Sequence, residues 1–522
     1  MFYYKVSFRK LQQKRRFFSY FKWGDRSFLG RKSVGKLFFT KKGSFCPFSL
    51  GNETDILKRN EEFLWKGKEK KMKYILKKSE KIILPSAANH PVVEEFLSNY
   101  TYGERWELAY HEEDRITIEN GAEIERENAE FVLNVTQDGV YISGEDYSAT
   151  MRGFITFLEK IKYEEKENYF YLETGCTYGK PKMKFRCAHL CLFPQTDLQF
   201  FRKCVRSCAI VKYSHLIFEF WGMFPFECLK ELSYPFAHSK EVIREIVEEA
   251  NALGVEIIPM FNHIGHASSC RGANGQHVVL DQNPRYAYLY ETYGWVWNFK
   301  REDVRELQRK MRDELIEVCG KGNYFHLGCD EVHSFLNDED NARGMAAYIN
   351  QVAAELREKG RRAIIWHDMM LSQDYWEEKY FGNSSRSVSD ILMNSIDKRI
   401  LIADWQYKNH DGPWKTSKRF KESGFDVVCC PWDDLQNNRE AAQTVEEYEL
   451  CGAIHTTWDT IISGFRSMIY AGKIFYGADD VDCLEDVIWF YSAEVVRKAM
   501  PCHGEYEKSG WSEKMTGMLQ YL

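Results

Sequence analysis

The sequence has few of the features that would assign it at once to a functional class. None of its 522 residues belong to an apolar run near the roughly 20 residues that a membrane-spanning helix needs. It carries no metal-ligand motif, no phosphate-cradling glycine loop and no nucleotide fingerprint. Its net charge of −6 argues against general affinity for nucleic acid. We therefore expect no cofactor, no metal, no nucleic-acid partner and no membrane span.

The cysteines do not form the pattern of a disulfide framework. Their number, 15, is odd, and several of them lie inside apolar, strand-like runs, namely Cys187, Cys191, Cys429 and Cys430. Buried, reduced thiols of this kind are typical of cytosolic proteins, so we expect a cytoplasmic location. The oligomeric state is not predicted by any feature of the sequence.

Composition changes along the chain and predicts four parts. Residues 1–71 are basic and rich in Phe, which fits a nucleic-acid or membrane-surface arm, a transit-like leader, or a poorly ordered extension outside the working protein. We favour the extension. Residues 72–180 mix strand patterns with an amphipathic helix over 148–161, which predicts a small α+β domain. A barrel over 181–478 and a helical segment over 479–522 are expected to follow.

From residue 184 onward, apolar strand patterns alternate with helical ones. Ser239 is placed as the N-cap of one helix, and Gly254 is placed at its C-terminal end. Eight such repeats over about 290 residues favour a (β/α)8 TIM barrel over an open sheet. The predicted strands are Phe185–Leu192, His215–Phe220, Glu256–Phe261, Tyr324–Cys329, Ala363–Trp366, Ile400–Trp405, Asp426–Cys430 and Gly452–Thr457.

The ends of these strands carry most of the chemistry-bearing residues. The fourth strand ends in two adjacent acids, Asp330 and Glu331, whose side chains would face opposite ways if the strand continued. Both can serve one site only if the chain turns there. Tryptophans at five of the eight strand ends indicate a cup for a neutral, ring-shaped, hydroxylated ligand. The predicted substrate-binding residues are His266, Trp366, Trp405, Tyr407, Trp432, Trp458 and Trp221.

These motifs resemble those of glycoside hydrolase family 20, the β-N-acetylhexosaminidases, over roughly residues 80–475. The segment His326-Leu327-Gly328-Cys329-Asp330-Glu331 matches the motif that the family places at the end of barrel strand four. Gly265-His266 matches the family's pair after strand three, and Trp366, Trp405 and Trp458 fall where the family places pocket tryptophans. The segment from Glu219 to Phe226, with Met223-Phe224-Pro225, and the segment Trp366-x-Asp368-Met369 look most like the hexosaminidase D-like branch.

The resemblance implies an exo-acting enzyme that removes terminal β-linked N-acetylhexosamine from an oligosaccharide or glycoconjugate. It implies a substrate-assisted retaining mechanism, in which the substrate's own 2-acetamido oxygen is the nucleophile. Glu331 would be the general acid and base, and Asp330 would orient the acetamido group. His266 is expected either to support Glu331 or a substrate hydroxyl, or to be a buried histidine bonded to the backbone. His326 is expected below Asp330.

The sequence departs from the family pattern at the groups that hold the outer sugar hydroxyls. Pro194 stands about where many members have an Arg, Trp221 or Gly222 where they have an acid, and Thr460 where they have a Glu. Trp432 or Tyr407 could replace the tyrosine that touches the acetamido group. Two alternatives therefore stay open: a carbohydrate-binding protein without activity, or a glycosidase for a sugar that lacks the acetamido group. The latter needs a second carboxylate, such as Asp368 or Asp433.

Overall fold

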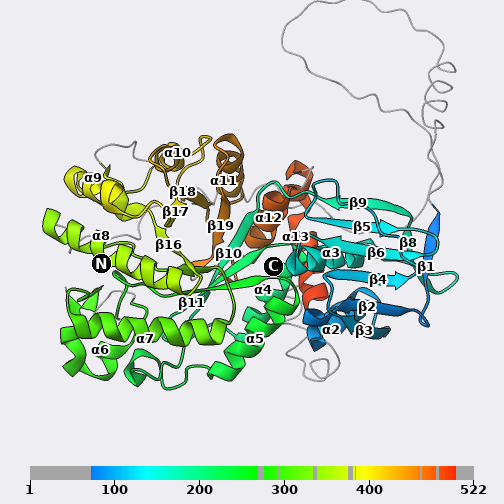
Figure 1. Cartoon of the computed structure of the whole chain (residues 1–522), viewed down its shortest axis with the longest axis horizontal. Coiled ribbons are helices and arrows are strands. Elements are labelled where there is room, and N and C mark those ends of the chain that lie inside the picture. The colour runs from blue at the N-terminus through cyan, green and yellow to red at the C-terminus, as the bar shows by residue number, and fades with distance from the viewer. Residues whose placement is uncertain are drawn as a thin grey trace, which may run out of the picture. The chain divides into compact units, whose positions relative to one another are not determined.

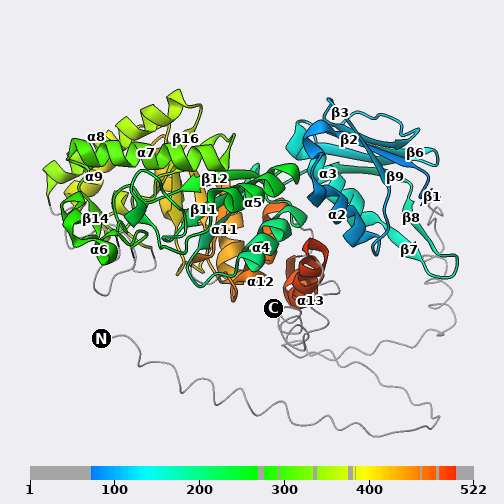
Figure 2. The ribbon, with the colours of Figure 1, turned by 90° about the horizontal axis from the view of Figure 1, so that it is seen from below.

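The structure is a computed structural model, and it describes residues 72–268, 275–291, 294–332, 338–373, 380–382, 384–458, 461–477 and 481–500. The predictions for residues 1–71, for Thr460 and for the end of the last segment lie outside the described residues. Figures 1 and 2 show a sheet-rich part formed by β1 to β9 and a ring of strands and helices formed by β10 and the elements after it.

Residues 73–179 form the small α+β domain. Its sheet has the strand order β3-β2-β4-β6-β5-β9, and a second sheet has the order β1-β8-β7. Helix α3 buries its apolar stripe against β4, β5 and β6, and α2 packs against α3. The elements are β1 Lys73–Leu76, β2 Lys81–Pro85, α2 Pro91–Tyr100, β3 Glu107–His111, β4 Arg115–Glu119, β5 Phe131–Val135, β6 Gly139–Gly144, α3 Tyr147–Lys160, β7 Lys162–Glu164, β8 Tyr169–Glu173 and β9 Gly175–Gly179.

Eight parallel strands close into a barrel because β10 pairs with β11 on one side and with β19 on the other. The predicted fold class is thereby confirmed, and each predicted strand is present within a few residues. The strands are β10 Phe185–Leu192, β11 His215–Phe220, β12 Glu256–Met260, β15 Tyr324–His326, β16 Arg362–Trp366, β17 Leu401–Trp405, β18 Asp426–Cys430 and β19 Gly452–Thr456.

Helices surround the barrel and cover the outward faces of its strands (Figure 1). Ser239 caps its helix as predicted, by accepting a hydrogen bond from the backbone N of Val242. The long loop after β12 carries a short helix and a two-stranded hairpin. The elements are α4 Leu198–Ile210, α5 Lys240–Ala252, α6 Val279–Gln282, β13 Tyr290–Glu291, β14 Val296–Trp297, α7 Glu302–Cys319, α8 Glu339–Glu358, α9 Arg386–Ser395, α10 Lys415–Glu422, α11 Leu435–Glu447, α12 Phe465–Tyr476 and α13 Val481–Ala499.

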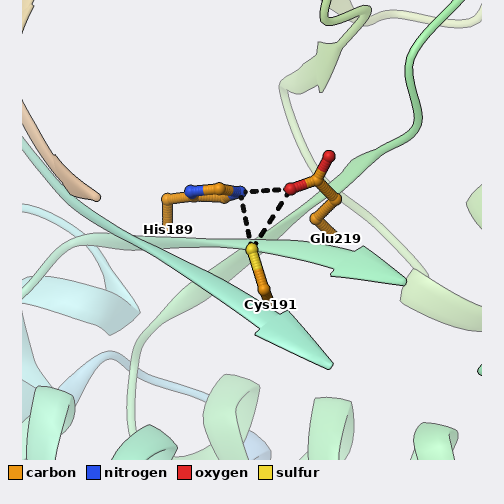
Figure 3. A group of neighbouring side chains, drawn as sticks. All are labelled: His189, Cys191 and Glu219. Carbon is orange, nitrogen blue, oxygen red and sulfur yellow. Dashed lines mark hydrogen bonds and ion pairs between the residues drawn. The ribbon is translucent and has the colours of Figure 1, made fainter. Parts of the chain in front are cut away.

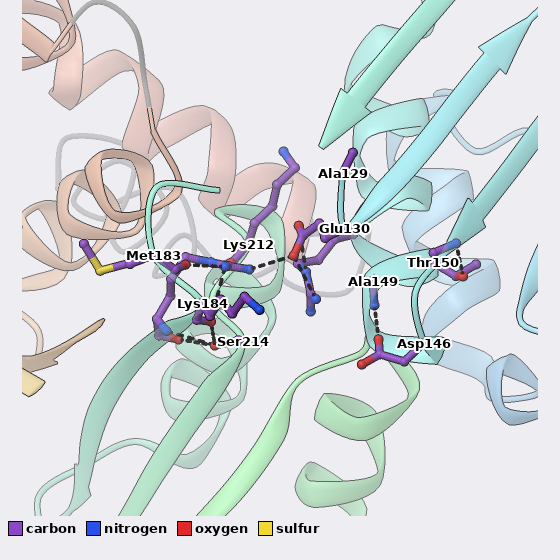
Figure 4. Close-up of polar contacts among 12 residues, drawn as sticks. Ala129, Glu130, Asp146, Ala149, Thr150, Met183, Lys184, Lys212 and Ser214 are labelled. Carbon is purple, nitrogen blue, oxygen red and sulfur yellow. Dashed lines mark hydrogen bonds and ion pairs between the residues drawn. The ribbon is translucent and has the colours of Figure 1, made fainter. Parts of the chain in front are cut away.

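A buried ion pair joins the small domain to the first barrel strand. Glu130 directly precedes β5 and faces two segments, one with Lys184 just before β10 and one with Lys212 just after α4 (Figure 4). Its Oε2 lies 3.0 Å from Nη2 of Arg152 and 3.5 Å from Nη2 of Arg186. Burial lowers the pKa of Arg186 to about 10, although the charge of Glu130 opposes this shift. One carboxylate thus compensates two buried guanidinium groups.

Removal of this carboxylate should destabilise the protein strongly. In Glu130→Ala the two guanidinium groups lose their counter-charge, and we expect the free energy of unfolding to fall by about 3–5 kcal/mol. Urea denaturation followed by tryptophan fluorescence measures this change. Glu125→Ala, at an exposed position five residues away, should stay within about 0.5 kcal/mol of the wild type. Equal stability of the two variants would contradict the assignment.

Candidate active site

The chain turns sharply after β15, and the turn is where the two adjacent acids lie. The strand ends at His326, three residues earlier than the sequence predicts. Gly328, Cys329 and Glu331 have φ angles of 65°, 74° and 52°, in the left-handed region that only glycine adopts without strain. Because the backbone twists at these positions, Asp330 and Glu331 both line the same cavity.

Three hydrogen bonds from other parts of the barrel hold this turn. The backbone N of Cys329 donates to Oδ1 of Asn262, at 2.8 Å. The backbone N of Glu331 donates to Oδ2 of Asp368, at 2.9 Å, and its carbonyl accepts from Nε1 of Trp295, at 2.8 Å. Asn262 follows β12, Asp368 follows β16, and Trp295 comes from the long loop between β12 and β15. Two neighbouring strand ends and a loop therefore fix a strained turn, as is common at active sites.

A cavity of about 880 Å³ opens at the C-terminal ends of the strands, within the usual size range of small-molecule sites. Its walls are mostly aromatic or apolar, and its described charged groups are Asp330, Glu331, His266 and Lys408. The other lining residues are Phe193, Pro194, Gln195, Thr196, Trp221, Tyr234, Gly275, Gln276, Val278, Tyr380, Phe381, Trp405, Gln406, Tyr407, Trp432, Trp458, Ile461 and Ile462.

His266 connects the two acids. Its Nε2 lies 3.5 Å from Oδ2 of Asp330 and 3.2 Å from Oε2 of Glu331. Burial alone would lower the pKa of His266, but the charge of Asp330 and the hydrogen bonds to both carboxylates raise it well above the usual value. The side chain of Asp330 is 5% exposed and that of Glu331 is 34% exposed. The three groups therefore form one partly desolvated cluster, in which the two carboxylates favour the charged form of His266.

One oxygen of Asp330 is available for a ligand. Oδ1 of Asp330 is buried and accepts no hydrogen bond from any residue that the structure describes. A buried acceptor of this kind normally has a partner, because its desolvation is otherwise uncompensated. Since Asp330 lines the cavity, a ligand N–H or O–H group can provide that partner.

Four of the predicted aromatic residues form one wall of the cavity. The ring of Trp405 stacks on that of Tyr407, with centroids 5.1 Å apart, and Trp432 lies 5.3 Å from the same tyrosine. Nε1 of Trp458 donates a hydrogen bond to the hydroxyl of Tyr407, at 2.9 Å. The tyrosine hydroxyl keeps its own proton for donation, because burial raises the pKa of Tyr407 well above the usual value.

Trp221 also lines the cavity. It stacks on Phe193 with centroids 5.0 Å apart, and it lies edge-on to His266 at 6.0 Å. The structure separates Trp366, a predicted substrate-binding residue, from the cavity. His326, which was expected below Asp330, does not line the cavity either. Both are buried, and their rings pack against each other at 4.2 Å.

Trp366 therefore departs from the position that the sequence predicts for it. It is 1% exposed and lies outside the residues that line the cavity, where a pocket wall was expected. The physical reason is strand alternation, which turns Trp366 into the barrel interior with Ile364, beneath Trp458. It supports the cavity wall from behind.

Several residues of the site have little signal in the sequence. Asp368 was assigned no role except as a possible second carboxylate, yet its side chain accepts a backbone hydrogen bond and does not line the cavity. Gln276, Phe381 and Gln406 line the cavity and come from loops without a motif. Pro194 lines the cavity at the position where the resemblance predicts an arginine. Asp433 is exposed and is not among the lining residues.

The comparison with protein families agrees with this geometry. Residues 210–463 match the sequence model of glycosyl hydrolase family 20, catalytic domain. The barrel is a glycosyl hydrolase family 20 catalytic domain. The chain is accordingly a glycoside hydrolase, and the match covers the turn with Asp330 and Glu331 together with every barrel strand after β10.

Relatives of the family 20 domain include two that carry the name hexosaminidase D. The protein from Bos taurus is 24% identical over 268 residues, which are 47% of this chain and 75% of the bovine protein. The protein from Homo sapiens is 26% identical over 171 residues, which are 30% of this chain and 33% of the human protein.

Solved structures with a similar fold include other family 20 enzymes. The Flavobacterium johnsoniae chitobiase has a TM-score of 0.57 at 15% identity, and the match covers 86% of this chain and 71% of that one. The β-N-acetylhexosaminidase of Streptomyces coelicolor A3(2) has a TM-score of 0.56 at 15% identity, covering 82% and 94%. These likenesses establish the fold that the family 20 domain shares with them.

The turn gives a direct test of how the acids are positioned. In Gly328→Ala the new methyl group would meet the carboxamide of Asn262, and the φ angle of 65° disfavours any side chain. The acids should shift, and we expect kcat on an aryl glycoside to fall by about 100-fold or more. Gly344→Ala is the control, because its Cβ would meet nothing and the residue lies in α8. Loss of activity in both variants, or in neither, would contradict this role for Gly328.

Proposed function

We propose that the protein is an exo-acting β-N-acetylhexosaminidase that uses a substrate-assisted retaining mechanism. The observation that carries the proposal is that Asp330 and Glu331 line one aromatic cavity, although they are adjacent in sequence. The substrate would be an oligosaccharide or glycoconjugate with a terminal β-linked N-acetylhexosamine. The names of the relatives support this substrate class.

In the first step the 2-acetamido oxygen attacks C1 of the sugar and the glycosidic bond breaks. Glu331 gives its proton to the departing oxygen, which leaves as an alcohol. Oδ1 of Asp330, which has no partner among the described residues, accepts the acetamido N–H and stabilises the positive charge of the resulting oxazolinium ion. The second step reverses these roles: water attacks C1, Glu331 takes its proton, and the β-anomer is released.

His266 acts as the proton partner of Glu331. The 3.2 Å separation between its Nε2 and Oε2 of Glu331 lets the pair hold one proton between them. The raised pKa of His266 keeps that proton in the pair at neutral pH. A site in which His266 and both acids were all unprotonated would have no proton for the leaving group.

The aromatic wall is suited to the N-acetyl group and the face of the sugar ring. Tyr407 receives the N–H of Trp458, so its own hydroxyl proton can be donated to the acetamido oxygen. Trp405 and Trp432 flank this tyrosine and offer apolar surface to the acetamido methyl group. The orientation of the attacking oxygen would thus be set by Asp330 on one side and Tyr407 on the other.

The two alternatives differ in how well the structure supports them. A glycosidase for a sugar without an acetamido group needs a second carboxylate in the cavity, and neither Asp368 nor Asp433 lines it. A protein that only binds sugar is favoured by one observation: Lys408 is the single lysine or arginine among the described lining residues. Binding of N-acetylglucosamine with no turnover of any N-acetylhexosaminide would select that alternative.

A cytoplasmic location is also part of the proposal. It is supported by the cysteines, none of which forms a disulfide in the described parts of the chain. No described helix is both long and apolar enough to cross a membrane.

Substitution of the two acids should separate their roles. Glu331→Gln should reduce kcat by about 10²–10⁴-fold on an alkyl N-acetylhexosaminide and much less on an aryl one with a good leaving group. Asp330→Asn should reduce kcat by about 10²–10³-fold on both substrates. Steady-state kinetics measure these effects, and thermal denaturation checks that each variant is folded.

The stereochemistry of the product gives an independent criterion. Proton NMR of the first turnovers should show β-N-acetylhexosamine before mutarotation. Hydrolysis of substrates without the 2-acetamido group at a comparable rate, or release of the α-anomer, would disprove the mechanism.

The raised pKa of His266 predicts a specific pH dependence. Its folded pKa exceeds the value of about 6.5 expected in the unfolded chain. The stability that protonated His266 contributes should thus be complete below about pH 6.5 and be lost as the pH rises through the folded pKa. The difference in unfolding free energy between wild type and His266→Gln should shrink as the pH rises above about 6.5, and its decline marks the folded pKa.

The alkaline limb of kcat/KM should follow the same group. The wild type should stay active above about pH 6.5, and His266→Gln should lose this part of the profile. His410→Gln is the control, because His410 is 43% exposed. Identical profiles for wild type and His266→Gln would show that His266 does not hold the proton.

A further inference from the structure

A second group of chemistry-bearing side chains lies in the barrel behind the cavity wall. His189 and Cys191 are on β10, two residues apart, and Glu219 is on the neighbouring strand β11, where it pairs in register with Cys191. Residues two apart on a strand share one face. All three side chains therefore meet inside the barrel (Figure 3).

The three ligand-type atoms are close together and fully enclosed. Nε2 of His189 lies 2.8 Å from Oε2 of Glu219. Sγ of Cys191 lies 3.5 Å from that nitrogen and 3.2 Å from that oxygen. Each of the three residues is 0% exposed. Within the described part of the chain, they form a group whose ligand atoms all lie within 4.8 Å of one another, close enough to hold one metal ion.

We propose that His189, Cys191 and Glu219 form a binding site for one Zn²⁺ ion. One nitrogen, one sulfur and one carboxylate oxygen make a borderline-soft donor set, which favours zinc over magnesium or calcium. With bond lengths of about 2.0–2.3 Å, a tetrahedral zinc ion holds its ligand atoms about 3.3–3.7 Å apart. The distances from Sγ of Cys191 to Nε2 of His189 and to Oε2 of Glu219 fit this range to within a few tenths of an ångström. The distance between Nε2 and Oε2, now 2.8 Å, would have to widen to about 3.3 Å. A water molecule can complete the tetrahedron.

Charge balance supports the assignment. A deprotonated Cys191 and an ionised Glu219 carry two negative charges, which one Zn²⁺ compensates without a net charge in the barrel interior. The remaining oxygen of Glu219, Oε1, accepts a hydrogen bond from Nε2 of Gln276. That bond is the kind of outer contact that orients a metal-binding carboxylate.

The site would support the catalytic cavity from behind. The ring of His189 lies 4.8 Å from that of Trp458, which lines the cavity. Gln276, held by Glu219, donates its backbone N–H to the carbonyl of His266 at 2.7 Å and accepts the backbone N–H of Asn262 at its Oε1. A metal ion here would therefore fix both the wall at Trp458 and the segment that carries His266.

The same cluster can also be held together by hydrogen bonds alone. In that arrangement Nε2–H of His189 and Sγ–H of Cys191 both donate to the carboxylate of Glu219. Cys191→Ser distinguishes the two cases. A serine hydroxyl can still donate to Glu219, but serine is a poor zinc ligand at neutral pH.

The experiment measures metal content and not activity, so it is independent of the proposed function. The full chain is expressed in medium with added Zn²⁺ and purified without chelators, because a fully enclosed ion is expected to bind as the barrel folds. Plasma mass spectrometry should then find about one zinc per chain. Cys191→Ser should lose that zinc and have a lower melting temperature. Cys187→Ser, a buried cysteine on the same face of β10, is the matched control and should keep it.

X-ray absorption at the zinc edge of the wild type tests the ligand set even if Cys191→Ser fails to fold. It should show one sulfur neighbour at about 2.3 Å and lighter neighbours at about 2.0–2.1 Å. Wild-type protein without bound zinc, equal zinc in the wild type and Cys191→Ser, or a zinc shell without sulfur would each overturn the proposal.

Discussion

The arrangement of this active site depends on a strained turn of four residues at the end of one barrel strand. Two consecutive side chains on a strand face opposite ways, so Asp330 and Glu331 can act together only where the backbone leaves the extended conformation. Positive φ angles at Gly328, Cys329 and Glu331 make that change. The strain persists because side chains from neighbouring strand ends and from a loop satisfy the polar groups of the turn.

The closed barrel provides the rigid frame for these contacts. Parallel strands bring all their C-terminal ends to one face, so residues far apart in sequence meet there. The same closure also removes polar groups from water. His266 and Asp330 are largely buried, and their mutual attraction outweighs the burial that would otherwise discharge the histidine. Desolvation and ion pairing thus act in opposite directions at this site, and the balance sets its proton content.

Much of the fold could be predicted from the sequence, because it is encoded locally. Apolar runs such as Asp426–Cys430 and caps such as Ser239 appear in the structure where predicted. The end of β15 was misjudged because the apolar run continues into the turn, where conformation is decided by Asn262 and not by hydrophobicity. Trp366 was misplaced because a tryptophan at a strand end faces either the cavity or the interior, and only the alternation in the folded barrel decides which.

By itself the sequence determined the repeating strand–helix order, the acids at the end of the fourth strand and the resemblance to family 20. These features depend on composition and spacing within short stretches. Only the tertiary structure decided that His266 touches both acids, that Asp368 holds the backbone beneath them, and that His189, Cys191 and Glu219 meet. Those contacts join different strands, and their distances depend on how the barrel closes, which no local pattern of residues specifies.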